Sequence, residues 1–272
     1  MTQLERSGDK IEVGMVRRIS RAWRLVGTGA SFVLFGLGSL ALAGVVFPIL
    51  RRLPGGSRER EFRCQRAVHR CFRFFVRFMT VLGVIEVELR GADLLREPGQ
   101  LIVANHPTLL DVVLLIALIP QADCVVKAEA WSNPFMRGAV TGAGYLRNDL
   151  GDRLIDVCAE HLRAGRSLLL FPGGTRSPRG EIGSLRRGAA HIALRSGRPL
   201  RPIFIGCEPT FLMRGQKWHE IPERRPHYTV ECGEIIDPDL LFLEGLKRGS
   251  AARVITAALR DFYTKRLQTL DS

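Results

Sequence analysis

Length, composition and charge narrow the class of protein before any motif is considered. The 272 residues are enough for one catalytic domain with an appendage. The 40 Lys and Arg residues outnumber the 27 Asp and Glu residues, and the formal net charge of +13 indicates a polyanionic partner such as nucleic acid, an anionic bilayer or a phosphate-bearing substrate. The six cysteines show no C-x-x-C pair and no ligand-like spacing to histidine, so we expect free thiols in a reducing compartment and no metal site.

The first predicted element is an uncharged apolar run at residues 25–50. As a helix it would be about 39 Å long, more than the roughly 30 Å of bilayer hydrocarbon. Arginines flank both ends, and because positively charged flanks prefer the cytoplasm, a single span satisfies only one of them. Five glycines and Pro48 favour a re-entrant helical hairpin within this run, with a simple span as the alternative. In either form we expect the chain to be anchored at the cytoplasmic face of the inner membrane.

The rest of the chain predicts an α/β fold. Residues 60–82 alternate arginine with phenylalanine, which predicts a basic, aromatic helix that lies on anionic headgroups or packs on the core, and completes a membrane-anchoring region at 1–82. In residues 83–240, short apolar runs alternate with helical patterns, as is typical of a layered domain with a largely parallel sheet flanked by helices. Residues 241–272 contain a closing helix. The predicted strands are Ile85–Leu89, Leu101–Ala104, Cys124–Lys127, Ser167–Phe171, Pro202–Gly206 and Tyr228–Cys232, and the predicted helices are Thr108–Leu118, Pro134–Thr141, Leu154–Ala164, Leu185–Arg195 and Leu246–Leu270.

A histidine and a carboxylate occur where the second predicted strand meets the next helix, in the run Asn105–Asp111. On one continuous helix their spacing of five residues would set the side chains about 140° apart, so they meet only if His106 lies in the preceding turn. Thr108 predicts such a turn as an N-cap with an acidic partner three residues on. Either Asp111 orients His106 as a general base, or it only caps the helix. Four other histidines have no partner that is evident from the sequence and are expected to be structural or exposed: His161, His191, His219 and His227.

A second candidate segment, Pro172–Ser177, follows the strand that ends at Phe171. Its paired glycines let the backbone approach a ligand closely, and the hydroxyl and guanidinium groups that follow suit an oxyanion such as phosphate. Further on, Arg186 and Arg187 add positive charge before a helix of small residues. An ordinary glycine-rich surface turn is the alternative interpretation.

Four blocks of the chain resemble the lysophospholipid acyltransferase family, which is typified by 1-acylglycerol-3-phosphate acyltransferase. The block N-H-x-x-x-x-D matches Asn105–Asp111, and G-x-x-[FY]-[IVL]-x-R falls on Gly142–Asn148. The block F-P-E-G-T-R-S falls on Phe171–Ser177, and the short strand P-[IV]-x-[IV] on Pro202–Ile205. The resemblance covers roughly residues 84–232 and is most specific in the first and third blocks.

The resemblance implies a membrane-bound O-acyltransferase. His106 would act as general base on the acceptor hydroxyl, oriented by Asp111, and the oxygen would attack an acyl thioester without an acyl-enzyme. The co-substrate would be acyl-CoA or acyl-ACP (acyl carrier protein) with no further cofactor, and the partners would be anionic membrane lipids, the thioester carrier and a lyso-lipid acceptor, with no nucleic acid. The positions that match acceptor-binding blocks are Gly174, Thr175, Arg176, Arg147 and Lys127.

Two positions depart from the family pattern. Gly173 replaces the usual glutamate of the third block, and Asn148 stands where the second block has arginine, with Arg147 one residue early. Both changes fall on the acceptor side, so we expect an acceptor other than plain lysophosphatidic acid, such as a lyso-aminolipid or a glycolipid-like species. The alternative is a catalytically impaired, acyltransferase-like membrane scaffold.

Overall fold

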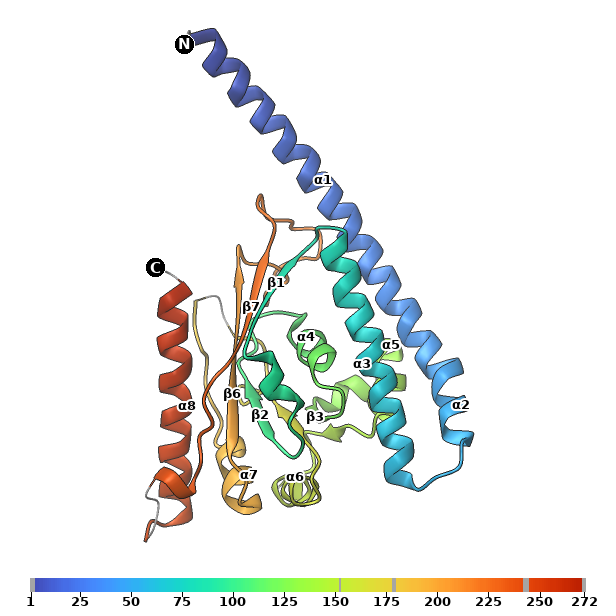
Figure 1. The fold of residues 1–272 in the computed structure, drawn as a ribbon, viewed down its shortest axis with the longest axis vertical. Helices are drawn as coiled ribbons and strands as arrows, with labels where there is room; N and C mark the ends of the chain where they lie inside the picture. The colour runs from blue at the N-terminus through green and yellow to red at the C-terminus, as the bar shows by residue number, and fades with distance from the viewer. Residues whose placement is uncertain (1–2, 152, 178–179, 242–244, 271–272) are drawn as a thin grey trace.

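The computed structural model describes residues 3–151, 153–177, 180–241 and 245–270. The described strands form one sheet in the order β1-β7-β6-β2-β5-β3-β4, and every neighbouring pair is parallel except β6 with β7. The predicted α/β fold with a largely parallel sheet flanked by helices is therefore confirmed (Figure 1). The strand bounds are β1 Glu86–Arg90, β2 Leu101–Ala104, β3 Asp123–Val126, β4 Leu146–Arg147, β5 Leu168–Leu170, β6 Leu200–Glu208 and β7 His227–Cys232.

The central strand β2 shows why the sheet forms. All four of its side chains are buried, as expected for a parallel strand covered on both faces. Because side chains alternate along a strand, Leu101 and Val103 join the core on one face while Ile102 and Ala104 join the core on the other. The two-residue strand β4 was not predicted, because it is too short to show an alternating pattern.

Helices cover both faces of the sheet (Figure 1). The core on one face packs against α3, α4 and the N-terminal helices, and the core on the other face packs against α6, α7 and α8. The helix bounds are α3 Ser57–Val81, α4 Asp111–Leu118, α5 Pro134–Gly142, α6 Arg153–Arg163, α7 Gly188–Ser196 and α8 Arg248–Leu270. Short 3-10 helices lie at Ala92–Arg96, Ala128–Trp131 and Asp239–Leu241.

The apolar N-terminal run is one continuous helix. Helix α1 (Gln3–Ala41) passes through a π-helical segment at Leu42–Val46 into α2 (Phe47–Arg52), so the prediction that residues 25–50 double back is wrong. Pro48 is accommodated near the start of α2, where the π-helical segment has already altered the hydrogen-bond ladder. The chain reverses only after Arg52, and α3 then runs back beside α1 (Figure 1).

This helix is long and apolar enough to cross a membrane. The stretch Met15–Arg52 contains a window of mean hydropathy 2.3, of which 17% is buried, so most of the window lies outside the protein core. The part that does pack is held closely by α5. A Cβ added at Gly138 would lie 2.2 Å from the Cβ of Ala43, and one added at Gly142 would lie 2.3 Å from the Phe47 ring. These two glycines therefore let α5 dock against the N-terminal helix.

The three predicted regions share these cores. Residues of α3 pack in the same hydrophobic cluster as the sheet, and α8 packs in the cluster on the opposite face. Of the predicted regions, residues 1–2, 242–244 and 271–272 lie outside the described residues. The division of the chain into independent units remains a prediction.

Candidate functional site

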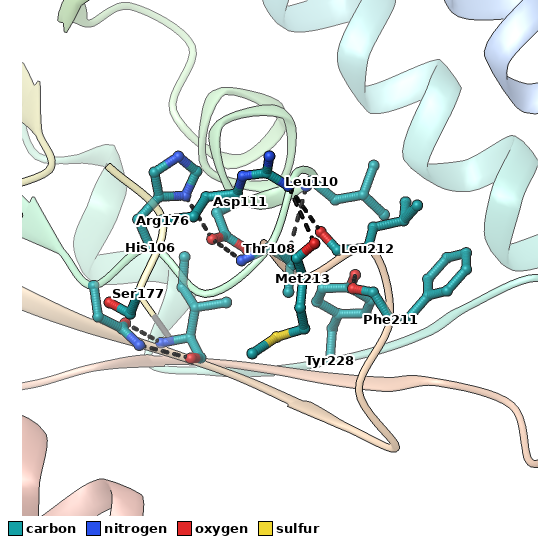
Figure 2. A network of polar contacts seen from close by, with 12 residues as sticks. His106, Thr108, Leu110, Asp111, Arg176, Ser177, Phe211, Leu212, Met213 and Tyr228 are labelled. Atoms are coloured by element: carbon teal, nitrogen blue, oxygen red, sulfur yellow. Dashed lines mark hydrogen bonds and ion pairs between the residues drawn. The ribbon is translucent and has the colours of Figure 1, made fainter. Parts of the chain in front are cut away.

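The structure brings His106 and Asp111 into direct contact. The Nδ1 atom of His106 lies 2.8 Å from Oδ2 of Asp111. Figure 2 shows the two side chains facing each other. The Asp111 side chain is fully buried, whereas 19% of the His106 side chain is exposed. A hydrogen bond at Nδ1 places the ring proton there and leaves Nε2 as the basic nitrogen for a substrate hydroxyl. The pair thus has the geometry that general-base chemistry requires.

The pair meets because the helix starts later than predicted. Helix α4 begins at Asp111, not at Thr108, so His106 lies in the turn before it. The backbone N–H of Leu109 donates to the carbonyl of Leu212 at 3.0 Å, which holds this turn outside the helix. Thr108 is not the N-cap residue. Its backbone N–H instead donates to Oδ2 of Asp111 at 2.7 Å, and its hydroxyl donates to Oδ1 at 2.5 Å.

Asn105 fixes the end of strand β2. Its side-chain amide donates to the carbonyl of Ile205 at 2.8 Å, and its side-chain oxygen accepts from the N–H of the same residue at 2.7 Å. Both backbone groups of Ile205 on β6 are therefore paired with one buried side chain. The resemblance included Asn105 in a motif, but its function as a clamp between two strands became evident only from the structure.

The glycine-rich block lies against the His106 turn. Strands β2 and β5 are parallel neighbours, so the segments that leave their carboxyl ends meet at the same edge of the sheet. The Phe171 ring lies 4.6 Å from the His106 ring, centroid to centroid, and the N–H of Ser177 donates to the His106 carbonyl at 2.7 Å. Gly174 has φ +66°, a conformation that favours glycine, and this lets the chain turn beside the histidine.

Arg176 reaches across the site. Its Nη1 lies 3.3 Å from the carbonyl of Leu212 and 3.4 Å from that of Met213 (Figure 2). Leu212 itself has φ +55°, which is uncommon for a residue with a side chain. Arg176 therefore braces the loop that also holds the turn before α4.

These residues open into one cavity of about 770 Å³. Its polar end contains the basic side chains of Lys127, Arg176 and Arg186 together with Gly174 and Thr175. Its other walls are mostly apolar and come from α1, α3 and α4. The apolar side chains that line it from α1, the π-helical segment and α3 include Phe32, Phe35, Leu42, Val68, Phe72, Phe75 and Met79. A polar site thus continues into a hydrocarbon-lined space beneath the N-terminal helix.

Arg147, one of the residues predicted to bind the acceptor lipid, does not line the cavity. The guanidinium of Arg147 donates to both carboxylate oxygens of Asp149, at 3.0 and 2.6 Å, and lies over the Trp131 ring. Among the described residues that line the cavity it is absent, whereas its neighbour Asn148 is present. Asn148 accepts from the N–H of Ala128 at 3.1 Å and so positions the segment that carries Lys127.

The departure at Gly173 also falls outside the cavity. A Cβ added there would lie 3.3 Å from the Thr175 carbonyl and 3.6 Å from that of Ser184. A Cβ at this position would therefore contact the backbone of the loop that follows, while the neighbours Pro172 and Gly174 both line the cavity. That this glycine removes a carboxylate from the acceptor site stays a prediction.

The cavity also contains a cysteine, Cys124. Burial raises the pKa of its thiol to about 12, so the thiol stays protonated at neutral pH. A protonated, buried thiol is a poor nucleophile.

Two histidines outside the site have carboxylate partners that the sequence analysis did not identify. Nδ1 of His161 lies 2.8 Å from Oδ2 of Asp123, and Nε2 of His227 lies 3.1 Å from Oε2 of Glu88. The structure therefore gives both histidines a partner that was not evident from the sequence. The partners are 38 and 139 positions away in the chain, so no local pattern could have identified them.

Several known acyltransferases are similar to this chain. A family model described as Acyltransferase matches residues 86–206. The 1-acyl-sn-glycerol-3-phosphate acyltransferase of Helicobacter pylori is 34% identical over 114 residues, which cover 39% of this chain and 48% of that protein. The lyso-ornithine lipid O-acyltransferase of Pseudomonas aeruginosa is 32% identical over 177 residues, which cover 63% of this chain and 65% of that protein.

A solved structure has the same fold. The crystal structure of the 1-acyl-sn-glycerophosphate acyltransferase PlsC from Thermotoga maritima matches with a TM-score of 0.65 at 18% identity, over 90% of this chain and 97% of that one. The chain spans 48% and 60% of the length of two curated relatives that it matches. The matched segment contains the His106 turn and the glycine-rich block, so residues 86–206 form an acyltransferase-family domain that is similar to the 1-acyl-sn-glycerol-3-phosphate acyltransferases.

Proposed function

We propose that this protein transfers a fatty acyl group from an acyl thioester to the hydroxyl of a lyso-lipid at a membrane. The observation that carries the proposal is the contact between His106 and the buried Asp111 at the polar end of a cavity with apolar walls. A base is placed where a lipid head group and a hydrocarbon chain can be bound side by side.

The reaction needs one proton carrier. Nε2 of His106 takes the proton of the acceptor hydroxyl as the oxygen attacks the thioester carbonyl carbon. Asp111 holds the proton on Nδ1 and stabilises the positive charge that develops on the ring. The tetrahedral intermediate then collapses, the carbon–sulfur bond breaks, and the thiol leaves with the proton from the imidazolium. The ester is formed and His106 returns to its neutral state.

The two ends of the cavity suit the two substrates. Apolar side chains of α1 and α3 offer a surface for an acyl chain, because burial of each methylene group contributes about 0.8 kcal/mol. Lys127, Arg176 and Arg186 offer positive charge to an anionic head group. A coenzyme A thioester and an acyl-ACP thioester present the same reactive group, and both are candidate donors.

Membrane association is supported by the exposed side chains of the N-terminal helices. Val26, Val33 and Leu37 on α1 are 65%, 62% and 60% exposed, and Phe74 on α3 is 60% exposed. Beside Phe74, four exposed arginines are spaced four, three and four residues apart, so they lie on one face of α3. This arginine stripe suits the anionic headgroups of the cytoplasmic leaflet. Its members are Arg66, Arg70, Arg73 and Arg77.

For the acceptor we propose a lyso-lipid other than plain lysophosphatidic acid, with a lyso-aminolipid first. Asn148 contributes an uncharged amide to the cavity where the family pattern has an arginine, which lowers the positive charge available to a phosphate monoester. A relative named lyso-ornithine lipid O-acyltransferase is among the similar proteins. The scaffold alternative rests on the glutamate missing at Gly173, and the intact contact between His106 and Asp111 argues against it.

The experiment is a substrate panel with purified, detergent-solubilised protein. Labelled acyl-CoA and acyl-ACP are each offered with lysophosphatidate, lyso-aminolipids and a lyso-glycolipid, and ester formation is measured. We expect transfer to a lyso-aminolipid that exceeds transfer to lysophosphatidate, and its loss in His106→Ala.

The matched control is His191→Ala, because His191 is not among the described residues of the cavity lining. This variant should retain the wild-type rate. Preferred acylation of lysophosphatidate would refute the acceptor assignment alone. Transfer that survives in His106→Ala would refute the mechanism.

A further inference from the structure

Thr108 supplies more hydrogen bonds to the catalytic carboxylate than the histidine does. Within the part of the chain that the structure describes, Asp111 accepts three hydrogen bonds. Two of them come from Thr108, through its backbone N–H at 2.7 Å and its hydroxyl at 2.5 Å. Both residues are completely buried. Removal of the Thr108 hydroxyl would remove the hydrogen bond that Oδ1 of Asp111 accepts from it.

We propose that Thr108 is a positioning residue that orients Asp111 toward His106, an inference that rests on the proposed function. The Thr108 hydroxyl binds Oδ1, and its backbone N–H and the His106 ring share Oδ2. These contacts prevent the carboxylate from rotating, so one lone pair of Oδ2 always faces Nδ1 of the imidazole. The ring proton is then held on Nδ1 and Nε2 stays free for the acceptor hydroxyl.

The proposal also depends on the charge of the donors. Both groups of Thr108 are neutral, and in the described part of the chain Asp111 forms its ion pair with His106 and with no lysine or arginine. Neutral donors satisfy the buried carboxylate without cancelling its charge. That charge remains available to the imidazolium that forms during proton transfer.

Thr108 is itself held in place. The N–H of Leu110 donates to its hydroxyl oxygen at 3.2 Å, which directs the hydroxyl proton away from Leu110 and toward Asp111. A β-bridge joins Thr108 to Met213, and the hydroxyl of the fully buried Tyr228 lies beside it (Figure 2). The hydroxyl is therefore oriented by Leu110 within the motif, and Thr108 is held in place by Met213 and Tyr228 outside it.

The test compares variants that differ in a single hydroxyl. Thr108→Val keeps the shape and loses the hydroxyl, Thr108→Ser keeps the hydroxyl, and Thr108→Ala is the matched partner of serine. We expect the valine and alanine variants to lower kcat by about 10- to 100-fold, because a hydrogen bond to a charged group is lost. KM for donor and acceptor should stay within about twofold and serine should restore most of kcat, since the acting group is the hydroxyl.

Two controls separate positioning from a general structural effect. Thr229→Val alters another buried threonine, on β7, and should leave kcat unchanged. If Thr108 acts through Asp111, the double variant Thr108→Val with Asp111→Asn should be no slower than Asp111→Asn alone. An unchanged kcat in Thr108→Ala, equal serine and alanine variants, or additive losses in the double variant would each overturn the inference. Because His106→Ala tests the base itself, the failure of the proposed function would be recognised separately.

Discussion

The described part of the chain contains two histidine–aspartate pairs with the same hydrogen bond and different surroundings. In both, Nδ1 of the histidine lies 2.8 Å from an aspartate oxygen, and both aspartates are fully buried. The His106 pair lies at the carboxyl ends of β2 and β5, and its histidine lines the large cavity. The His161 pair lies at the amino-terminal ends of the strands, because its aspartate, Asp123, is the first residue of β3.

Apart from the histidine, the two aspartates accept hydrogen bonds from different kinds of donor. Asp111 receives its other hydrogen bonds from the neutral Thr108, whereas Asp123 is bound by Nε of Arg166 at 2.6 Å and also by Nη2. Burial opposes the ionisation of Asp123, but the hydrogen bonds from His161 and Arg166 outweigh it and lower the pKa of the carboxyl. The guanidinium therefore neutralises the charge that His161 would need to act as a base. A short histidine–aspartate distance alone does not identify a catalytic pair.

The Arg166 side of the second pair has a structural function. Nη1 of Arg166 binds Glu61 on α3 at 2.9 Å, and Nε2 of Gln65 on the same helix binds Asp123 at 2.9 Å. Helix α3 is thus tied to the sheet by a buried polar cluster. The same helix lines the cavity at its other end, so this cluster helps to hold the cavity wall in position.

The largest expected difference is between the two aspartate-to-asparagine variants. Asp111→Asn should lower kcat by about 100- to 10,000-fold, because the imidazole loses the group that fixes its tautomer and stabilises its charge. Asp123→Asn should leave kcat within about threefold and lower the stability instead. Steady-state rates and thermal unfolding in the same detergent measure both effects. A similar loss of kcat in both variants would mean that the two pairs do not have separate functions.

Next in size is the effect of removing the cation from the second pair. Arg166→Met should reduce the free energy of unfolding by about 3–5 kcal/mol, because Asp123 and Glu61 lose their charged partner while Asp123 stays buried. Arg195→Met is the control, since the ion pair of Arg195 with Asp156 is exposed and contributes about 0–1 kcal/mol. Denaturant titration in detergent measures the difference. Equal losses in the two variants would show that the buried cluster is no more than another surface pair.

Much of this architecture could be predicted from the sequence, and the failures have physical causes. Strand β2 was predicted with its observed bounds because all four residues are apolar and buried. Helix α7 was predicted to begin at Leu185 but begins at Gly188, because the N–H of Arg186 is bound to the Pro172 carbonyl. Local patterns carry no information about such a bond between distant segments.

The same limit applies to the site. The contact between His106 and Asp111 was predicted because the two residues are near in sequence and a turn could bring them together. The direction of Arg147 depends on Asp149 and the Trp131 ring, and the cavity depends on how α1 packs over the sheet. Motif spacing identified the chemistry, but tertiary packing decided which basic side chains face it.

The smallest expected effect is on the pH dependence of stability, to which the Asp123 carboxylate of the second pair contributes. The pKa of Asp123 is lower in the folded protein than in the unfolded chain, so the carboxylate contributes stability above the unfolded value of about 3.9. That contribution is lost as the pH falls from about 5 through the lowered pKa, because the unfolded chain takes up the proton first. Wild-type protein should therefore lose more thermal stability between pH 6 and pH 3 than Asp123→Asn does. Parallel curves for the two proteins would show that Asp123 is not the group whose protonation loosens α3.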